Sequence, residues 1–372
     1  MHKRVIIMSQ VYKIVLTGGP CGGKTTAIHF LKQELTHRGI AVFCLDEMAT
    51  KLKNAGKTPE NMGNYAFHSL LFREQLKTER SIETSAAEAE AEKSVILCDR
   101  GLLDNKAYVS EDDFKQYSSE CGCLENQLLC SYDAVFHLVT AAKGAEKYYT
   151  LENNKARSED IEQARERDDA VLSVWVGTPH LRILDNRGDF QEKLQRLLQE
   201  TLAVLGIPKP MEIERKFLIL YPDLNLLEKM QTCRKVFLSQ TYLNTPDEGK
   251  FRVRQRGAGE QAVYIKTIKR KINEMKRIET EEKISEEEYC RYISMKEYSL
   301  GTISKYRYCI AWGSTYYELD VFPFWDKLAL LEIELLSEEE EYTIPDFVTV
   351  LREVTMEKAF RNLALAKKFG NK

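Results

Sequence analysis

The sequence predicts two domains of different fold class: an α/β domain with a parallel sheet covered by helices, followed by an antiparallel β-barrel with helices. Two observations predict this. In the first half of the chain, short apolar runs alternate with longer charged segments of helical periodicity, the pattern of a parallel sheet buried on both faces. In the second half, many short segments alternate between apolar and polar residues, which is typical of an antiparallel sheet that closes on itself.

Five apolar segments in the first half have the length and composition of buried strands. The charged stretches between them are long enough for crossover helices, so the strands are expected to run parallel. The segments are Tyr12–Leu16, Ala41–Leu45, Ser94–Cys98, Ala134–Val139 and Leu181–Leu184.

The pattern changes at Leu205–Pro210, where two prolines and a glycine follow a helical segment. Residues of these types mark a linker. We therefore expect a first domain of residues 1–207 and a second domain of residues 208–372. A chain of 372 residues has the length of two ordinary domains.

Eight segments beyond the linker have the period-2 alternation of strands with two different faces. They are Glu212–Leu220, Val236–Leu243, Phe251–Arg256, Ala262–Thr267, Arg277–Ile284, Ile303–Trp312, Tyr316–Val321 and Leu328–Leu335. The final segment, Phe347–Phe369, has apolar residues at helical spacing and predicts a helix.

Composition and charge exclude several classes of protein. Hydrophobic residues make up 43% of the chain and charged residues 30%, which is enough apolar material for folded cores. The net charge of -3 leaves no global basic field, so no nucleic-acid partner is expected. No apolar run reaches the ~20 residues of a membrane helix, and the nine cysteines lack paired CxxC sets. We expect a cytoplasmic protein with reduced thiols, whose only membrane contact would be peripheral.

A glycine-rich stretch in the first half matches a phosphate-binding pattern. Residues 18–25 read Gly-Gly-Pro-Cys-Gly-Gly-Lys-Thr, which fits G-x-x-x-x-G-K-[ST] between a predicted strand and a predicted helix. Its glycines let backbone N–H groups turn toward phosphates, Lys24 reaches the β- and γ-phosphates, and the Thr25 hydroxyl binds Mg²⁺. Thr26 would bond the α-phosphate. The predicted nucleotide-binding residues are Gly18, Gly19, Pro20, Cys21, Gly22, Gly23, Lys24, Thr25 and Thr26.

Carboxylates at strand ends offer further ligands and a catalytic base. Asp99 follows the strand Ser94–Cys98, where the fold would place a second Mg²⁺ ligand. Asp46 and Glu47 end the preceding strand at the same edge of the sheet, so one of them is a candidate base or metal helper. The alternative for Asp46 and Glu47 is a structural role as caps and surface acids.

A charged stretch over residues 153–168 predicts a helical hairpin that closes over the triphosphate. Arg157 and Arg165 would there neutralise the charge that spreads over a transferring phosphoryl group. A charge-rich helix is as often a solvated surface, so both interpretations stay open.

One face of almost every predicted strand in the second half carries charges, while the other face is mainly apolar. Because alternate residues of a strand share a face, Glu212, Glu214 and Lys216 point together. The same phase recurs along the later strands. Its basic members are Arg252, Arg254, Lys266, Lys305 and Arg307, and its acidic members are Glu279, Glu281, Glu318, Asp320, Glu332 and Glu334.

These charges are segregated by sign, with acids on some strands and bases on others. An ordinary small barrel has an apolar interior and its charges in water, and alternation alone does not say which face is inside. A sheet closed around the charged face would instead form a tunnel. Its basic side would hold a polyphosphate, and its carboxylates would hold a divalent metal that polarises the terminal phosphorus for attack by water.

The charged strands resemble the CYTH or triphosphate tunnel metalloenzyme superfamily from Met211 to the C-terminus. The resemblance rests on Glu212-x-Glu214-x-Lys216, Arg252-x-Arg254, Lys266, Glu279-x-Glu281, Lys305-x-Arg307, Glu318-x-Asp320, Glu332-x-Glu334 and Phe360–Ala364. It implies an antiparallel tunnel that binds triphosphate-containing ligands with Mg²⁺ or Mn²⁺.

The first half resembles an AAA-type P-loop domain related to nicotinamide-riboside kinases, through residues 16–26, Asp99-Arg100-Gly101 and residues 132–140. The two domains in this order are similar to the eukaryotic TRPL translocation defect protein family. That resemblance implies binding of guanine nucleotides, binding of phosphoinositide or phosphatidic acid, and a role in membrane-protein trafficking. No residue motif separates GTP from ATP, so GTP is favoured only by the family.

Three functions remain open on this basis. The favoured one is an enzyme with Mg²⁺-dependent nucleotide binding and hydrolysis at the P-loop and triphosphate binding or hydrolysis in the tunnel. A second is a GTP-regulated adaptor whose tunnel or rim recognises phosphoinositide headgroups. A third is a small-molecule kinase in which Asp46 or Glu47 receives the proton of the acceptor.

Overall fold

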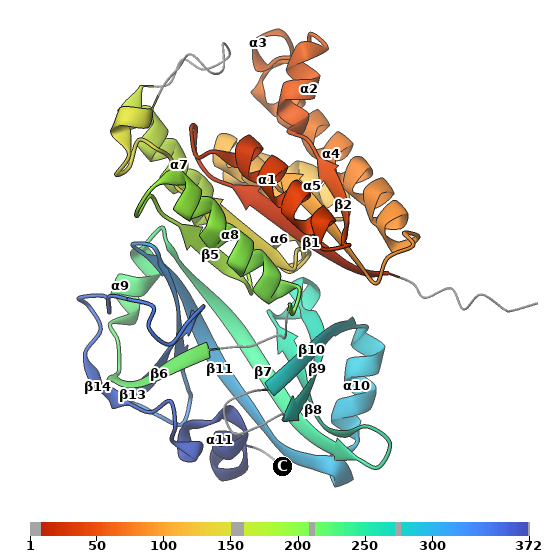
Figure 1. Cartoon of the computed structure of the whole chain (residues 1–372). Helices are drawn as coiled ribbons and strands as arrows, with labels where there is room; N and C mark the ends of the chain where they lie inside the picture. Colours follow the sequence, from red (N-terminus) through yellow and green to blue (C-terminus); the bar gives the residue numbers. More distant parts are fainter. Residues whose placement is uncertain (1–8, 150–159, 208–212, 272–276, 371–372) are drawn as a thin grey trace, which may run out of the picture. The chain divides into compact units, whose positions relative to one another are not determined.

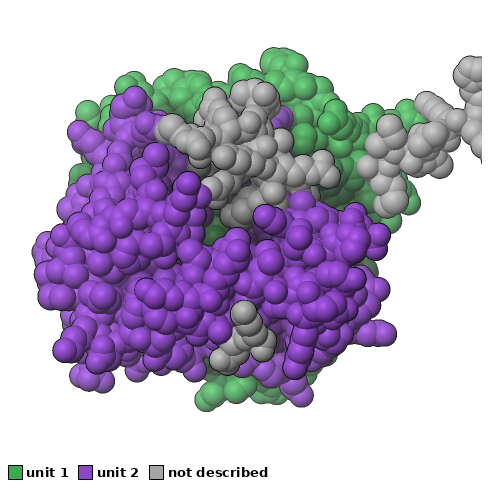
Figure 2. All heavy atoms as spheres, turned by 90° about the horizontal axis from the view of Figure 1, so that it is seen from below, with its two compact units in different colours: residues 1–201 green, residues 202–372 purple. Residues whose placement is uncertain are grey.

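The computed structural model of the chain describes residues 9–149, 160–207, 213–271 and 277–370. The chain divides into two compact units, Met1–Thr201 and Leu202–Lys372, which Figure 2 draws in different colours. Each unit is built around a sheet of its own. The two are therefore described in turn.

The first unit contains a five-stranded sheet in which all neighbouring strands run parallel. Its strand order is β2-β3-β1-β4-β5. The strands are β1 (Gln10–Thr17), β2 (Ala41–Leu45), β3 (Lys93–Asp99), β4 (Ala134–Leu138) and β5 (Leu181–Leu184). Each overlaps its predicted segment, which confirms the α/β class of this part of the chain.

Helices flank this sheet and provide the crossover connections (Figure 1). They are α1 (Lys24–His37), α2 (Met48–Asn54), α3 (Pro59–Met62), α4 (Asn64–Ala87), α5 (Glu111–Glu120), α6 (Glu125–Leu129), α7 (Ile161–Trp175) and α8 (Phe190–Val204). Because the strands are parallel, their carboxyl ends share one edge of the sheet, where such folds bind ligands. No helix of the described residues is both long enough and apolar enough to span a membrane.

The second unit contains a nine-stranded antiparallel sheet of order β10-β9-β8-β7-β11-β12-β13-β6-β14. Its strands are β6 (Ile213–Leu220), β7 (Cys233–Thr245), β8 (Gly249–Arg256), β9 (Val263–Lys271), β10 (Arg277–Ile284), β11 (Ser299–Trp312), β12 (Thr315–Val321), β13 (Leu328–Leu335) and β14 (Val350–Glu353). The α-helices that accompany them in the described residues are α9 (Leu224–Lys229), α10 (Glu286–Ser294) and α11 (Asn362–Phe369). All eight predicted strands are present.

The predicted helix over Phe347–Phe369 is wrong in its first half. Val350–Glu353 form β14, which pairs antiparallel with β6, and the α-helix begins only at Asn362. Apolar residues over such a short stretch fit a helix and a strand equally well. The unpaired edge of β6 decides between them, because it offers backbone hydrogen bonds that a helix here would leave unmade.

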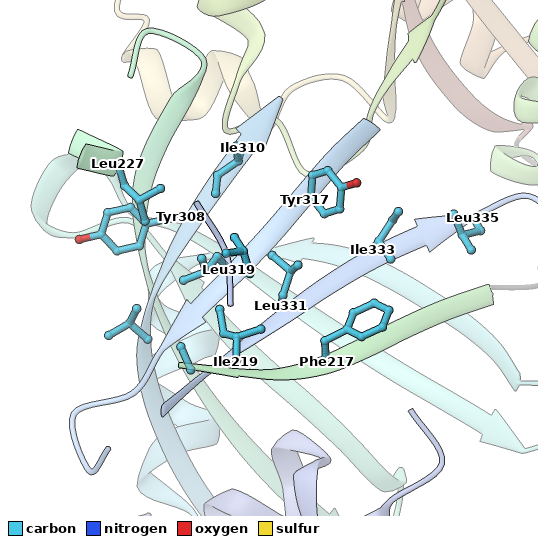
Figure 3. Close-up of a cluster of buried hydrophobic side chains, with 13 residues drawn as sticks. Phe217, Ile219, Leu227, Tyr308, Ile310, Tyr317, Leu319, Leu331, Ile333 and Leu335 are labelled. Atoms are coloured by element: carbon cyan, nitrogen blue, oxygen red, sulfur yellow. The ribbon is translucent and has the colours of Figure 1, made fainter. Parts of the chain in front are cut away.

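One face of the second sheet carries a cluster of buried apolar side chains, most of them from β6, β11, β12 and β13 and one from α9, which Figure 3 shows in close-up. Its labelled members are Phe217, Ile219, Leu227, Tyr308, Ile310, Tyr317, Leu319, Leu331, Ile333 and Leu335. On each of these strands the residues between the cluster members must point to the opposite face. Those intervening residues include the charged ones that the sequence analysis singled out.

Candidate functional site

The glycine-rich loop connects the end of β1 to the start of α1. Gly18 and Gly23 have φ angles of 133° and 84°, which side chains rarely allow. A Cβ atom on Gly22 would lie 2.6 Å from the carbonyl oxygen of Leu138, and one on Gly18 would collide with the same oxygen. The loop can therefore pack against the end of β4 only with glycine at these positions.

Lys24 lies buried beneath this loop at the first position of α1. Its Nζ donates to the carbonyl oxygens of Gly18 at 2.9 Å and Gly19 at 3.0 Å. Burial and repulsion from Arg100 lower the pKa of Lys24 to about 8. Within the described part of the chain, the hydrogen bonds of this ammonium group go to backbone oxygens, which a bound phosphate could replace as acceptor.

Asp99 ends β3 and is only 8% exposed. Its Oδ1 is buried and has no hydrogen-bond partner in the part of the chain that the structure describes. Burial raises the pKa of Asp99 to about 6, against the attraction of Lys24. Thr25, the second proposed metal ligand, is exposed in the first turn of α1. A hard oxygen donor left without a partner beside the loop fits a Mg²⁺ ion.

Glu47, rather than Asp46, reaches the residues around Asp99. Its Oε1 accepts a hydrogen bond of 2.9 Å from Nε of Arg100. Burial opposes ionisation of Glu47, but the Arg100 guanidinium outweighs it and lowers the pKa to about 2. Asp46 is exposed and pairs with Lys51 at 3.1 Å. The structure therefore does not bring Asp46 to the loop.

A residue of α7 that sequence reasoning missed braces the loop from the other side. Asp168 is buried, and its Oδ1 accepts from the backbone N–H groups of Gly19 at 2.8 Å and Thr140 at 3.2 Å. His137 Nε2 lies 3.1 Å from the same oxygen, and Lys143 Nζ lies 3.1 Å from Oδ2. Although burial opposes ionisation, His137 and Lys143 hold the pKa of Asp168 well below its usual range.

The predicted lid is described only from Asp160 onward, and Arg157 lies outside the described residues. Arg165 is tied to its own neighbourhood: its Nε donates to the carbonyl oxygen of Ala142 at 2.7 Å. Its other nitrogens pair with Glu146 at 3.1 Å and Glu162 at 3.0 Å. Arg165 therefore does not contact the glycine-rich loop.

In the second unit, strand register places charged side chains on the face opposite the apolar cluster. Residues directly opposite each other share a face, and the pairing sets Arg307 across from Asp320, Glu332 across from Lys216 and Glu334 across from Glu214. We call this set the charged face. Its described members are Glu214, Lys216, Arg252, Arg254, Arg256, Glu281, Lys305, Arg307, Glu318, Asp320, Glu332 and Glu334.

The centre of the charged face is buried. Lys305 is 1% exposed and Asp320 is fully buried, while Glu214 and Glu281 are exposed. The interpretation in which these charges all lie in water therefore does not hold. Alternation could not decide this point, because it does not say which face of a sheet is covered.

Arg307 neutralises most of the acidic side of the charged face. Its Nε and Nη2 donate to the two carboxylate oxygens of Asp320 at 2.7 Å each. Nη2 also pairs with Glu332 at 2.8 Å, and Nη1 pairs with Glu318. Lys216 adds ion pairs of 2.8 Å to Glu332 and 2.9 Å to Glu214.

Arg254, on β8, has no such anion. Among the described residues it makes no ion pair, and its buried Nε has no hydrogen-bond partner. Burial and the neighbouring Arg252 lower the pKa of Arg254 to about 10. Arg252 itself is engaged by Thr267 at 3.0 Å and Glu281 at 3.2 Å. The basic side of the face is therefore short of negative charge.

The carboxylates are the candidate metal ligands of this face. Partial burial raises the pKa of Glu318, and repulsion from the neighbouring Glu332 raises the pKa of Glu214. These hard oxygen donors fit a divalent cation. No preformed group of three or more metal-binding side chains occurs within the described residues, where Arg307 and Lys216 hold the carboxylates instead. Glu212 lies outside the described residues, and so does the side chain of Glu279 on β10.

Lys266 does not belong to the charged face, in contrast to the sequence prediction. It lies on β9 directly opposite Val253, an apolar-core residue, whereas its neighbour Thr267 lies opposite Arg252. Its Nζ donates to the Tyr292 hydroxyl at 2.9 Å and pairs with Glu248. The register between β8 and β9 decides which residues of β9 lie on the charged face, and this register cannot be read from the sequence of β9.

Arg256 and Gln240 share the charged face and were not predicted. Arg256 continues the spacing of Arg252 and Arg254 by two residues and is buried. That spacing was visible in the sequence. Gln240, on β7, lies directly opposite Arg254. No sequence signal pointed to it, because a neutral amide does not stand out in a charge pattern.

Comparison with known families divides the chain in the same two parts. Residues 13–193 match the model of an AAA domain, and residues 210–358 match the model of a CYTH domain. Two crystal structures of one protein, described as an inorganic triphosphatase and as a hypothetical protein, are each 30% identical to this chain. They cover 43% and 42% of this chain, which covers 97% and 98% of theirs, with a TM-score of 0.30 in both cases. No curated protein matches.

Proposed function

The chain joins an AAA domain to a CYTH domain, and from this we propose that it handles polyphosphate at two sites. The glycine-rich loop binds a nucleoside triphosphate with Mg²⁺ and hydrolyses it. The charged face binds a triphosphate-bearing ligand and hydrolyses its phosphoanhydride bond with a divalent metal.

The observation that carries this proposal is Arg254, a half-buried residue whose Nε is buried and which has no anionic partner among the described residues. An uncompensated buried charge destabilises a fold by several kcal/mol. Elsewhere on the charged face, Arg307 and Lys305 avoid that cost by pairing with Asp320. A cation kept unpaired in this setting is best explained by a ligand that brings the missing negative charge.

The residues around Arg254 suit a polyphosphate chain. Arg252 and Arg254 are two positions apart on β8, about 7 Å along the strand, so they can bind adjacent phosphate groups. Glu214 and Glu318 would hold a metal on the other side of the ligand. A bound metal supplies charge neutralisation and polarises the phosphorus that water attacks. Arg307 would keep the remaining carboxylates from repelling the ligand.

At the glycine-rich loop, Lys24 would exchange the carbonyl oxygens of Gly18 and Gly19 for phosphate oxygens. Asp99 and Thr25 would hold Mg²⁺, since Asp99 has a buried oxygen without a hydrogen-bond partner among the described residues and Thr25 lies in the first turn of α1. Nothing in the geometry separates GTP from ATP. The preference for GTP rests on the family resemblance alone.

The geometry favours this proposal over a small-molecule kinase. A general base needs a pKa near the working pH, whereas ion pairing with Arg100 lowers that of Glu47 to about 2. Asp46, the other candidate base, is exposed and paired with Lys51. The adaptor alternative stays open, because a phosphoinositide headgroup carries the same phosphate chemistry as a polyphosphate.

The direct test is phosphate release by the chain from tripolyphosphate, GTP and ATP, with Mg²⁺ or Mn²⁺ and again with EDTA. We expect release from tripolyphosphate and from at least one nucleotide, and its loss with EDTA. Release that survives EDTA would contradict the metal sites. If tripolyphosphate binds without release, and vesicles containing phosphoinositide bind as well, the adaptor is the better description. Absence of both binding and release overturns the proposal.

Replacing Lys266 with methionine tests which face of β9 contacts the ligand. Lys266 points toward Tyr292 and Glu248, away from Arg252 and Arg254. We therefore expect tripolyphosphate affinity, measured by isothermal titration calorimetry, to change by less than about twofold, within the range of a distant surface charge. A loss of about tenfold or more would restore Lys266 to the site that the sequence predicted.

A further inference from the structure

We propose that Gln240 binds ligand on the charged face, its side-chain amide donating to an oxygen of the phosphate group that Arg254 also holds. The inference rests on the proposed function, because it takes a polyphosphate as the occupant. Gln240 would add a neutral hydrogen-bond donor to a site whose other proposed ligand-binding residues are charged.

Gln240 is placed where it can share a ligand with Arg254. Gln240 lies in the middle of β7 and is fully buried. Antiparallel pairing sets it directly opposite Arg254 on β8. Directly opposed residues have Cβ atoms about 5 Å apart on the same face. The two side chains can therefore reach a single phosphate group.

The orientation of the amide is the second argument. Oε1 of Gln240 accepts from Nη1 of Arg252 at 3.4 Å and from the hydroxyl of Tyr242 at 3.3 Å. A guanidinium can only donate, so the amide oxygen must face Arg252. This turns the Nε2 amino group away from Arg252, and Nε2 is buried without a hydrogen-bond partner among the residues that the structure describes.

Unsatisfied buried donors are rare in folded proteins, because each loses its bonds to water and gains none. Here the Nε2 of Gln240 and the Nε of Arg254 occur as such donors directly across two paired strands. Both lack an acceptor, and neither can accept a hydrogen bond itself. A phosphate oxygen offers only lone pairs, so one phosphate group would satisfy both donors.

The choice of glutamine is the third argument. A glutamate at position 240 would have the same shape, but its carboxylate would pair with Arg254 and Arg252 and compete with the ligand for both. An apolar residue would leave the arginines free but would lose the donor. A neutral amide keeps Arg254 available and adds a hydrogen bond. The alternative is that Nε2 donates to a buried water. In that case, removing the amide would not change the affinity for the ligand.

The test measures tripolyphosphate binding by isothermal titration calorimetry in the whole chain carrying Lys24→Ala, which silences the first site. Gln240→Met removes the donor at similar size, and we expect affinity to fall about tenfold, as for one lost hydrogen bond to a charged group. For Gln240→Glu we expect a fall of about 100-fold or more, together with a higher Tm without ligand, because the new carboxylate pairs with Arg254.

Thr241→Val is the matched control: Thr241 is the next residue, faces the other way and bonds to Thr302 at 2.9 Å.

Affinity should be unchanged in Thr241→Val, even if its Tm falls. Wild-type affinity in Gln240→Met would overturn the inference and assign a water to Nε2, while leaving the proposed function intact. Equal losses in Gln240→Met and Thr241→Val would also overturn it, since they would report general damage to β7. If the Lys24→Ala chain with Gln240 in place does not bind tripolyphosphate at all, the proposed function fails at this site and the inference fails with it.

Discussion

Replacing Lys24 with alanine is expected to weaken nucleotide binding to the glycine-rich loop by about 100-fold or more, the loss of several charge-assisted hydrogen bonds. Lys24 is buried beneath the loop, where its ammonium group donates to the carbonyl oxygens of Gly18 and Gly19. Its lowered pKa, about 8, indicates that the charge is under-compensated without a ligand. Titration with fluorescent GTP and ATP analogues in the presence of Mg²⁺ measures the effect.

Lys32→Ala is the matched control, because Lys32 lies exposed on the same helix, α1. We expect it to bind nucleotide like the unmodified chain. Tripolyphosphate release by the charged face should survive in both variants. Nucleotide affinity in Lys24→Ala within about twofold of the control would contradict the assignment of the loop. Loss of both activities would mean that the two sites are coupled.

Much of the fold could be predicted because strand signals in this chain are local. Runs such as Ser94–Cys98 are apolar and bounded by polar segments, and the structure has β3 there. The wrong helix prediction at Phe347–Phe369 has a non-local cause. β14 forms there because it pairs with the edge of β6. A window of sequence contains its own periodicity but not the partner that competes for its backbone.

The sequence predicts the glycine-rich loop of the nucleotide site, but not the residues from other elements that bind to the loop. The pattern from Gly18 to Thr25 and the strand-end position of Asp99 are both visible in sequence. Asp168 is not, because it reaches Gly19 from a helix about 150 residues away. The choice between Asp46 and Glu47 likewise depended on where Arg100 points, which is a tertiary fact.

On the charged face, the phase of a strand decides which residues belong. Arg252 and Arg254 were correctly placed together because they lie two positions apart on one strand. Lys266 was assigned from a different strand, whose phase relative to β8 depends on register. Periodicity within one strand therefore predicts which of its residues share a face. It does not predict which face of a neighbouring strand lies on the same side of the sheet.

Arg307 and Arg254 are expected to respond to alanine substitution in opposite ways. Arg307 is paired with Asp320, Glu332 and Glu318. Its removal would leave Glu318 without an ion pair among the described residues, while Asp320 would keep its pair with Lys305 and Glu332 its pair with Lys216. Breaking a buried pair on one side costs about 3–5 kcal/mol. We therefore expect Arg307→Ala to lower the unfolding free energy of the second unit by that amount, measured from its transition in a urea titration.

Arg254→Ala should leave that transition unchanged or shift it to higher urea, because the substitution removes a half-buried cation that has no anionic partner among the described residues. Its tripolyphosphate affinity should nevertheless fall about 100-fold, since the ligand loses a charge-assisted pair in a buried site. Lys235→Ala is the control: Lys235 lies on β7, pairs with Glu228 on the surface and sits opposite Tyr308, on the apolar-cluster side of the sheet. It should bind and unfold like the unmodified chain. If Arg254→Ala loses stability as Arg307→Ala does, Arg254 is a structural partner of carboxylates rather than a group held ready for a ligand.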